Sequence, residues 1–131
     1  MLVQIKIKTV SRTEMVDITP LLQRELSQKG FSDGICIIYV PHTTAGITIN
    51  EGADPAVCMD IINKLNELVP PYAGCRHMEG NSDSHIKASL IGSSVSVIID
   101  KGNLCLGTWQ KIFFCEFDGP RSREVLMKIV S

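Results

Sequence analysis

The stretch SVSVIIDKGNLCLG, residues 94–107, decides the fold class. Its first half is rich in valine and isoleucine, and the run NLCLG that ends it is also apolar, so both halves favour β-strand. The residues DKGN between them are typical of a tight turn, which joins two antiparallel strands in a hairpin. Strands expected over 109–117 and 123–130 extend the hairpin into an antiparallel meander.

The N-terminal half contributes three more expected strands. Residues 3–9, VQIKIKT, alternate apolar and polar side chains, which predicts a half-buried strand. Residues 34–40, GICIIYV, form a continuous β-branched run, which predicts a buried strand. After Pro41, residues 46–50, GITIN, resume in extended form.

Three helices are expected, within residues 19–30, 54–68 and 83–92. Thr19 and Asp54 suit the capping position, and each precedes a proline, which is favoured at the first helical position. A glycine ends the first and the third helix. The strands cluster without regular strand–helix alternation. The pattern therefore predicts an α+β fold, a single compact domain over 1–131 with mainly antiparallel sheets and about three helices.

Composition narrows the class of protein. The chain has 131 residues, 44% apolar and 21% charged, as is ordinary for one globular domain. A net charge of -1 and 5% aromatic residues argue against a nucleic-acid-binding protein. No apolar run approaches the roughly 20 residues of a membrane helix, and the N-terminus lacks a secretory core, so we expect a cytoplasmic protein without a membrane partner. Five cysteines without a CxxC pair argue against a disulfide framework.

Candidate site residues follow the strand predicted before Pro41, in the stretch PHTTAGITINEGADP (41–55). His42 comes directly after that strand, where a side chain is held by the sheet yet exposed at its rim. Thr43 and Thr44 add hydroxyl groups. Glu51 follows the next short strand, which could return the chain toward His42.

The stretch RHMEGNSDSHIK, residues 76–87, holds the other two histidines. His77 and Glu79 are two residues apart, so in extended backbone they project to the same side. His85 falls in the first turn of the third predicted helix, where the helix dipole disfavours an imidazolium and keeps the ring able to bind a metal. Three imidazoles and a water form a known catalytic zinc arrangement, but the spacing here contains no motif such as HExxH. The alternative is a solvated loop that happens to contain histidine.

The start of the same helix also offers backbone N–H groups to an anion near Ser84, with Lys87 close by. Further along, Arg121 could hold a phosphate or carboxylate, or could equally pair with the neighbouring Asp118. The single tryptophan, Trp109, favours a packing role over a pocket wall.

Taken together, these blocks resemble the YjbQ family of small proteins, which carries the label secondary thiamine-phosphate synthase. The similarity lies in HTTA followed by NE, in HMEG with SHIK, and in GTWQ, and it spans nearly the whole chain. It implies a trimeric α+β protein with a divalent metal ion in a cleft, held by His42, His77 and His85. Zinc is the metal that we expect. The same blocks include polar residues whose implied role is substrate binding: Thr43, Thr44, Asn81, Ser84, Lys87, Gln110 and Arg121.

The resemblance leaves two kinds of function open. The first is a metal-dependent enzyme acting on a small phosphorylated substrate, with Glu51 or Glu79 as the general base. This kind includes a hydrolase and a transferase with weak thiamine-phosphate synthase activity. The second is a non-catalytic homo-oligomer, in which the histidines bind a small molecule or connect subunits. We expect a homotrimer in either case.

Overall fold

The structure is a computed structural model of the chain, and it describes residues 2–71 and 80–131. The elements in this part of the chain are β1 (Leu2–Lys8), β2 (Glu14–Asp17), α1 (Thr19–Lys29), β3 (Asp33–Tyr39), β4 (Ala45–Glu51), α2 (Pro55–Leu68), α3 (Ser82–Ile91), β5 (Ser94–Asp100), β6 (Asn103–Leu104), β7 (Gln110–Glu116) and β8 (Ser122–Val130).

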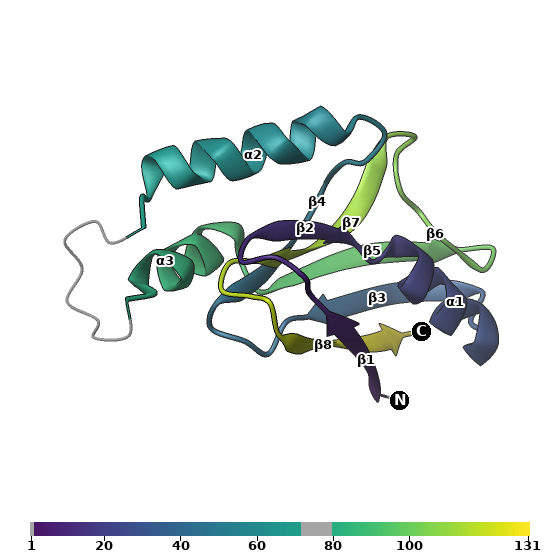
Figure 1. The fold of residues 1–131 in the computed structure, drawn as a ribbon. Helices are drawn as coiled ribbons and strands as arrows, with labels where there is room; N and C mark the ends of the chain where they lie inside the picture. The colour runs from purple at the N-terminus through teal and green to yellow at the C-terminus, as the bar shows by residue number, and fades with distance from the viewer. Residues whose placement is uncertain (1, 72–79) are drawn as a thin grey trace.

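The strands form two sheets (Figure 1). One has five strands in the order β1-β8-β3-β5-β6, and the other has three in the order β2-β7-β4. All of the strand pairs described are antiparallel. The predicted hairpin joins β5 to β6, with Ile99 opposite Leu104. The α+β fold with antiparallel sheets is therefore confirmed, with three helices in the described residues.

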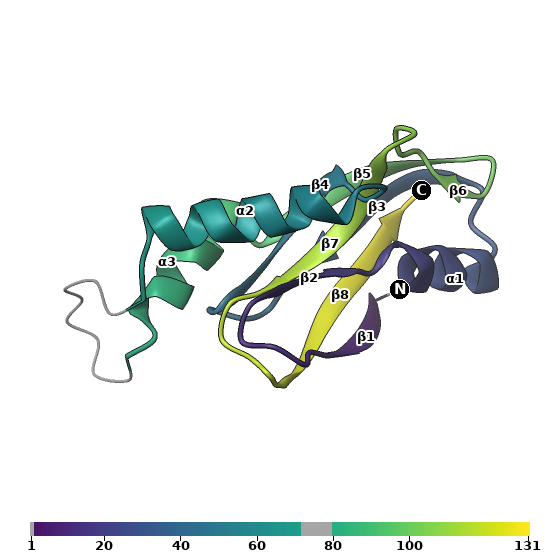
Figure 2. The same cartoon turned by 45° about the horizontal axis from the view of Figure 1, so that its top comes forward.

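Strand β7 lies between two apolar cores. Ile112 and Phe114 belong to the larger core, which the inner face of the five-stranded sheet and α1 also enter. Phe113 and Cys115 point to the opposite side and pack with residues of α2 and α3. Both faces of β7 are buried, because α2 and α3 cover one face and the five-stranded sheet covers the other. Helices α2 and α3 lie side by side in two views (Figures 1 and 2).

One strand was not predicted, and two local expectations were wrong. Strand β2 has only four residues, EMVD, which are too few to show an alternation of apolar and polar side chains. It nevertheless forms an edge of the three-stranded sheet. The N-cap of α1 is Ile18, while the hydroxyl of Thr19 accepts a hydrogen bond from the Ile112 backbone N–H at 2.8 Å. Strand β3 is buried on one face only, because none of the described elements covers its outer side chains. These are Ile35, Ile37 and Tyr39, between 40% and 48% exposed.

Helix α3 approaches β4 closely, and a glycine permits this. A Cβ added at Gly46 would lie 2.7 Å from the backbone oxygen of Gly92, the residue that ends α3. The Ile47 backbone N–H donates to that oxygen at 3.0 Å. The contact fixes α3 against the beginning of β4, and so places His85 near the loop that carries Thr43.

Within the described residues, no helix combines the length and the apolar character required to cross a membrane.

Candidate functional site

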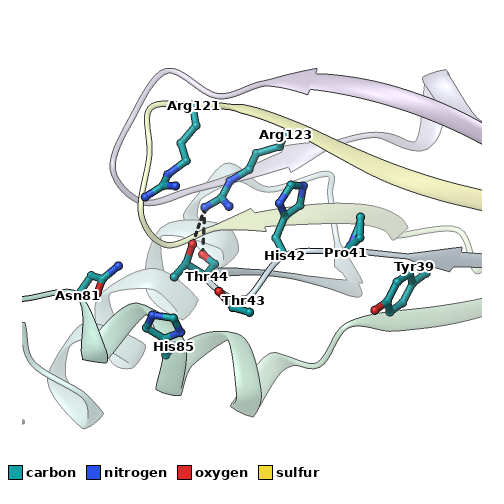
Figure 3. A pocket seen from close by; sticks show the side chains of 9 residues that line it. All are labelled: Tyr39, Pro41, His42, Thr43, Thr44, Asn81, His85, Arg121 and Arg123. Carbon is teal, nitrogen blue, oxygen red and sulfur yellow. Dashed lines mark hydrogen bonds between the residues drawn. The ribbon is translucent and has the colours of Figure 1, made fainter. Parts of the chain in front are cut away.

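A cleft of about 610 Å³ lies where three segments distant in sequence meet (Figure 3). They are the loop between β3 and β4, the start of α3, and the start of β8 with the loop before it. The described residues that line the cleft are Tyr39, Pro41, His42, Thr43, Thr44, Asn81, His85, Arg121 and Arg123. In Figure 3, His85 on α3 faces the loop that carries Thr43, while His42 and Arg123 lie on the other side.

His42 is held at the end of the five-stranded sheet, where the pairing of β3 with β8 stops. Its Nε2 accepts a hydrogen bond from the backbone N–H of Glu124 at 3.0 Å. Strand β3 ends at Tyr39, which pairs with Leu126, so Glu124 lies beyond the last residue of β8 that pairs with β3. The imidazole therefore replaces the backbone acceptor that β3 no longer provides.

This environment keeps His42 neutral. Burial lowers its pKa, and the charge of Arg123 lowers it further. The carboxylates of Glu124 and Glu116 act in the opposite direction but do not prevail. A neutral ring whose Nε2 accepts a hydrogen bond carries its own hydrogen on Nδ1. His42 is thus a hydrogen-bond donor through Nδ1.

Arg123 is the most rigidly held cation of the cleft. Its side chain is 3% exposed and forms a two-point ion pair with Glu116, through Nε to Oε1 at 2.9 Å and Nη2 to Oε2. Nη2 also donates to the hydroxyl of Thr44 at 2.8 Å. No hydrogen bond of Nη1 is found within the described part of the chain. Because the other two nitrogens are occupied, Nη1 is the group of Arg123 left for a ligand in the cleft.

Glu116 is the buried acceptor that orients Arg123. Besides the guanidinium, its carboxylate accepts from the Thr9 hydroxyl at 2.7 Å and from the Asp118 backbone N–H at 3.1 Å. Burial alone would raise the pKa of Glu116, but the hydrogen bonds from Arg123, Thr9 and Asp118 and the charge of Arg123 outweigh it and lower the pKa. The carboxylate is therefore ionised at neutral pH.

Arg121 stands at the rim of the cleft and pairs with Asp118, as one of the two sequence interpretations proposed. Its Nη2 donates to Asp118 Oδ2 at 2.7 Å, and its side chain is 49% exposed. The same oxygen accepts from Asn81 Nδ2 at 2.8 Å. Asn81 Oδ1 is buried and has no hydrogen-bond partner within the described residues.

Two predicted binding residues lie beneath the cleft. Ser84 is buried, and its hydroxyl donates to the backbone oxygen of Phe117. Lys87 is fully buried and donates to Asp83 at 2.8 Å and to Asn66 of α2 at 2.7 Å. Neither lines the cleft described above, and both connect α3 to neighbouring segments.

Two other predicted residues lie at the far end of the three-stranded sheet. Glu51 ends β4 and pairs with Gln110 at the start of β7. The seven residues of β4 span about 20 Å at about 3.3 Å per residue, and the cleft lies at the opposite end. The Glu51 carboxylate accepts from the backbone N–H groups of Ala53 and Asp54, ahead of α2. The fold of one chain therefore does not bring Glu51 or Gln110 to the cleft. Nearby Trp109 is 63% exposed, so it does not pack into the core of this chain.

His77 and Glu79 lie outside the described residues. The structure therefore brings two of the three predicted metal ligands, His42 and His85, to one cleft and leaves the third untested. No group of three or more metal-binding side chains is found over residues 2–71 and 80–131.

Sequence reasoning missed Arg123 and Glu116. A signal for both was present in the alternation of their strands. Arg123 shares the inward face of β8 with Val125 and Met127, which are both buried, and Glu116 shares that of β7 with Phe114. Opposite charges at inward positions of two strands predict a buried ion pair, provided that the strands meet.

The family model "UPF0047 protein YjbQ-like" matches residues 3–131 of this sequence. The chain belongs to the YjbQ-like UPF0047 family. A UPF0047 protein of Methanocaldococcus jannaschii is 58% identical over 130 residues, which cover 99% of this chain and 94% of that protein. The family member YugU of Bacillus subtilis is 50% identical over 131 residues, which cover 99% of both chains.

Solved structures of YjbQ-like proteins share the fold. An uncharacterized YjbQ/UPF0047 family protein of Clostridium acetobutylicum has a TM-score of 0.95 at 50% identity over 98% of this chain and 99% of its own. A hypothetical protein of Aeropyrum pernix has a TM-score of 0.95 at 35% identity over 100% and 98%. These names state no activity, substrate or partner, so the chemistry has to be argued from the cleft.

Proposed function

We propose that the cleft binds the phosphate group of a small molecule and that the protein acts on this molecule by acid–base chemistry. The proposal rests on one observation. The described lining side chains include two guanidinium groups and two imidazoles but no carboxylate. Guanidinium groups bind phosphate through paired N–H donors, and imidazole is the side chain best suited to proton transfer near neutral pH.

The roles follow from the hydrogen bonds already made. Nη1 of Arg123 and the guanidinium of Arg121 would bind phosphate oxygens, and the exposed hydroxyl of Thr43 would add a donor. His42 would donate from Nδ1, because its Nε2 is occupied by Glu124. His85, on the other side of the cleft, would exchange a proton with the reacting group.

Phosphate binding is the first test. Titration calorimetry with inorganic phosphate should show binding that weakens about tenfold or more in Arg121→Gln and in His42→Gln, since each removes a donor to a charged group. Glutamine at position 42 can still accept the Glu124 N–H, so the fold should persist. Lys128→Gln, an exposed residue on β8, is the control for lost charge. Equal affinity in all four proteins would refute the proposal.

A zinc ion at His42, His77 and His85 is part of the wider proposal that the family resemblance suggests. A neutral His42 meets one requirement for a ligand, but the nitrogen not bonded to Glu124 carries a hydrogen. Ligation would require breaking the Glu124 hydrogen bond or removing that hydrogen. When bound, zinc would supply a water of lowered pKa. The described residues fit an anion better than they fit this ion.

Metal content tests the zinc proposal without reference to activity. The protein would be purified without a histidine tag or chelator and analysed by plasma mass spectrometry. Close to one zinc per chain, lost in His42→Ala and His85→Ala, would support a metal-dependent enzyme. Much less than one metal per chain would exclude a resident metal in this cleft.

In a homotrimer, Glu51 and Gln110 of one subunit could lie beside the cleft of a neighbouring subunit. Glu51, proposed as a general base, and Gln110 could act only if the far end of one subunit's sheet reached the cleft of its neighbour. Light scattering would measure the molar mass of the assembly, which should be three times that of one chain. Cysteines introduced at Glu51 and Thr43 should then cross-link between subunits, and a monomer would leave Glu51 without a catalytic role.

Weak thiamine-phosphate synthase activity is the second candidate, favoured by the cationic lining. Guanidinium groups could stabilise the charge that builds on a departing diphosphate. The test is growth of a thiamine auxotroph carrying this protein. Growth that survives His42→Ala combined with His85→Ala would place any such activity outside the cleft. A protein that binds phosphate but turns over no phosphorylated compound would support the non-catalytic alternative.

A further inference from the structure

We propose that the cleft continues past His42 into a second subsite, where Lys6 and Lys8 bind a second anionic group of the same ligand. The inference rests on the proposed function and narrows it to one ligand class. The ligand would be a small molecule with two anionic groups joined by a short connection.

A second hollow, of about 490 Å³, adjoins the cleft on the β1–β8 surface. It shares His42 and Arg123 with the cleft, so these two side chains form the boundary between them. The other polar residues that line it are Lys6, Lys8, Ser122 and Glu124. In the sheet, Lys6 lies opposite Glu124 and Lys8 opposite Ser122, so all four belong to one small area of the surface.

The two lysines point to the same side of the sheet. They are two residues apart in β1 and both are exposed, whereas Ile7 between them is buried in the core. Their Cα atoms are about 6–7 Å apart at about 3.3 Å per residue. Two ammonium groups at this spacing can contact different oxygens of one anion. No ion pair of either lysine with a carboxylate is found in the described part of the chain.

The charge of the hollow also favours an anion. Glu124 is the one carboxylate among its described lining residues, and it offsets one of the two lysines, leaving +1 from Lys6, Lys8 and Glu124. Arg123 also lines the hollow, but Glu116 offsets its charge. The described carboxylates do not neutralise the hollow, so a negatively charged group is attracted to it.

Arg123 explains why the two positions would serve one ligand. This residue lines both hollows, and its guanidinium is almost fully buried and fixed by Glu116. One anionic group in the cleft and one beside Lys6 would therefore lie on either side of His42 and Arg123. Two unrelated anions would repel each other at this distance, but a covalent connection between them offsets the repulsion.

The test compares a ligand with one anionic group to a ligand with two. Titration calorimetry would use inorganic phosphate and methylene diphosphonate, which cannot be hydrolysed. We expect the diphosphonate to bind about tenfold or more tightly than phosphate. Lys6→Gln combined with Lys8→Gln should remove that preference while changing phosphate affinity less than about threefold. Lys64→Gln combined with Lys128→Gln removes two positive charges elsewhere, and should keep the preference.

The outcomes separate this inference from the proposed function. Equal binding of phosphate and diphosphonate by the unmodified protein would overturn the second subsite and leave the cleft as a phosphate site. Equal losses in the two double variants would also overturn it, because they would show a non-specific effect of net charge. If phosphate itself does not bind, or binds independently of Arg121 and His42, the proposed function fails and the second subsite fails with it.

Discussion

His42 and Glu124, 82 positions apart in the sequence, are joined by a 3.0 Å hydrogen bond in which the imidazole Nε2 accepts a backbone N–H. The same ring therefore closes the end of a β-sheet ladder and faces the cleft. Because one nitrogen is used by the sheet, the fold decides which nitrogen remains for a ligand. The stability of this end of the sheet and the chemistry of the cleft both depend on this contact.

Replacing His42 should separate these two roles. His42→Ala leaves the Glu124 N–H without its acceptor and should cost about 1 kcal/mol or more in the free energy of unfolding. His42→Gln, whose side-chain oxygen can take the place of Nε2, should cost less, although both variants lose the Nδ1 donor. Urea denaturation would measure the difference. If the two variants are equally stable, the hydrogen bond to Glu124 contributes little.

Acidification should destabilise the protein partly through His42. Because the folded state lowers the pKa of His42, the unfolded chain binds a proton more readily below pH of about 6.5. The free energy of unfolding should therefore fall as the pH drops from 7.5 to 5.5. In His42→Gln the fall should be smaller. Denaturation curves at several pH values would check this, and equal pH dependence in both proteins would contradict it.

Glu116 should be among the most costly residues to replace. Glu116→Gln removes the negative charge that compensates buried Arg123, and should cost about 3–5 kcal/mol at pH 7. The control is Glu67→Gln, whose pair with Lys64 is exposed, and it should change stability little.

The effect of Glu116 should also depend on pH. The folded pKa of Glu116 is lowered, so its contribution is complete above the ordinary glutamate pKa and is lost as pH falls through the folded value. The stability difference between the unmodified protein and Glu116→Gln should therefore shrink in acid. A difference that stays constant down to pH 3 would show that the ion pair is not its source.

Lys87 should affect stability rather than ligand affinity. Lys87→Met leaves Asp83 with one fewer cation and breaks the hydrogen bond to Asn66 that connects α3 to α2. The loss should be about 3 kcal/mol in thermal or urea unfolding. Phosphate affinity, measured well below the unfolding temperature, should stay within about twofold. A stable variant that binds phosphate poorly would instead support the direct binding role that the family resemblance implies for Lys87.

Gly46→Ala should disturb the contact between α3 and β4. The new Cβ would lie 2.7 Å from the Gly92 oxygen, which is backbone and cannot rotate away. We expect a loss of about 1–3 kcal/mol and weaker phosphate binding, since α3 carries His85. Ser96→Ala, on an exposed face of β5, is the control and should change stability by less than about 0.5 kcal/mol. Unchanged stability in Gly46→Ala would mean that α3 adjusts freely.

The sequence by itself determined the local elements. The alternation in residues 3–9, the valine- and isoleucine-rich run at 94–100 and the turn that follows it predicted strands and a hairpin, because side-chain period and turn chemistry depend on neighbouring residues only. Proline and glycine predicted the ends of α1 for the same reason. Motif positions also pointed to His42 and His85, which do line one cleft.

Only the tertiary structure decided which residues meet. Thr9 and Glu116 are 107 positions apart, and their hydrogen bond depends on how the two sheets pack. The strand patterns of Arg123 and Glu116 showed charges at inward positions but not that these two residues would meet. The fold likewise placed Glu51 at the far end of β4 and buried Lys87, although both lie in motif blocks. Strand order and register are non-local, so no window of sequence contains them.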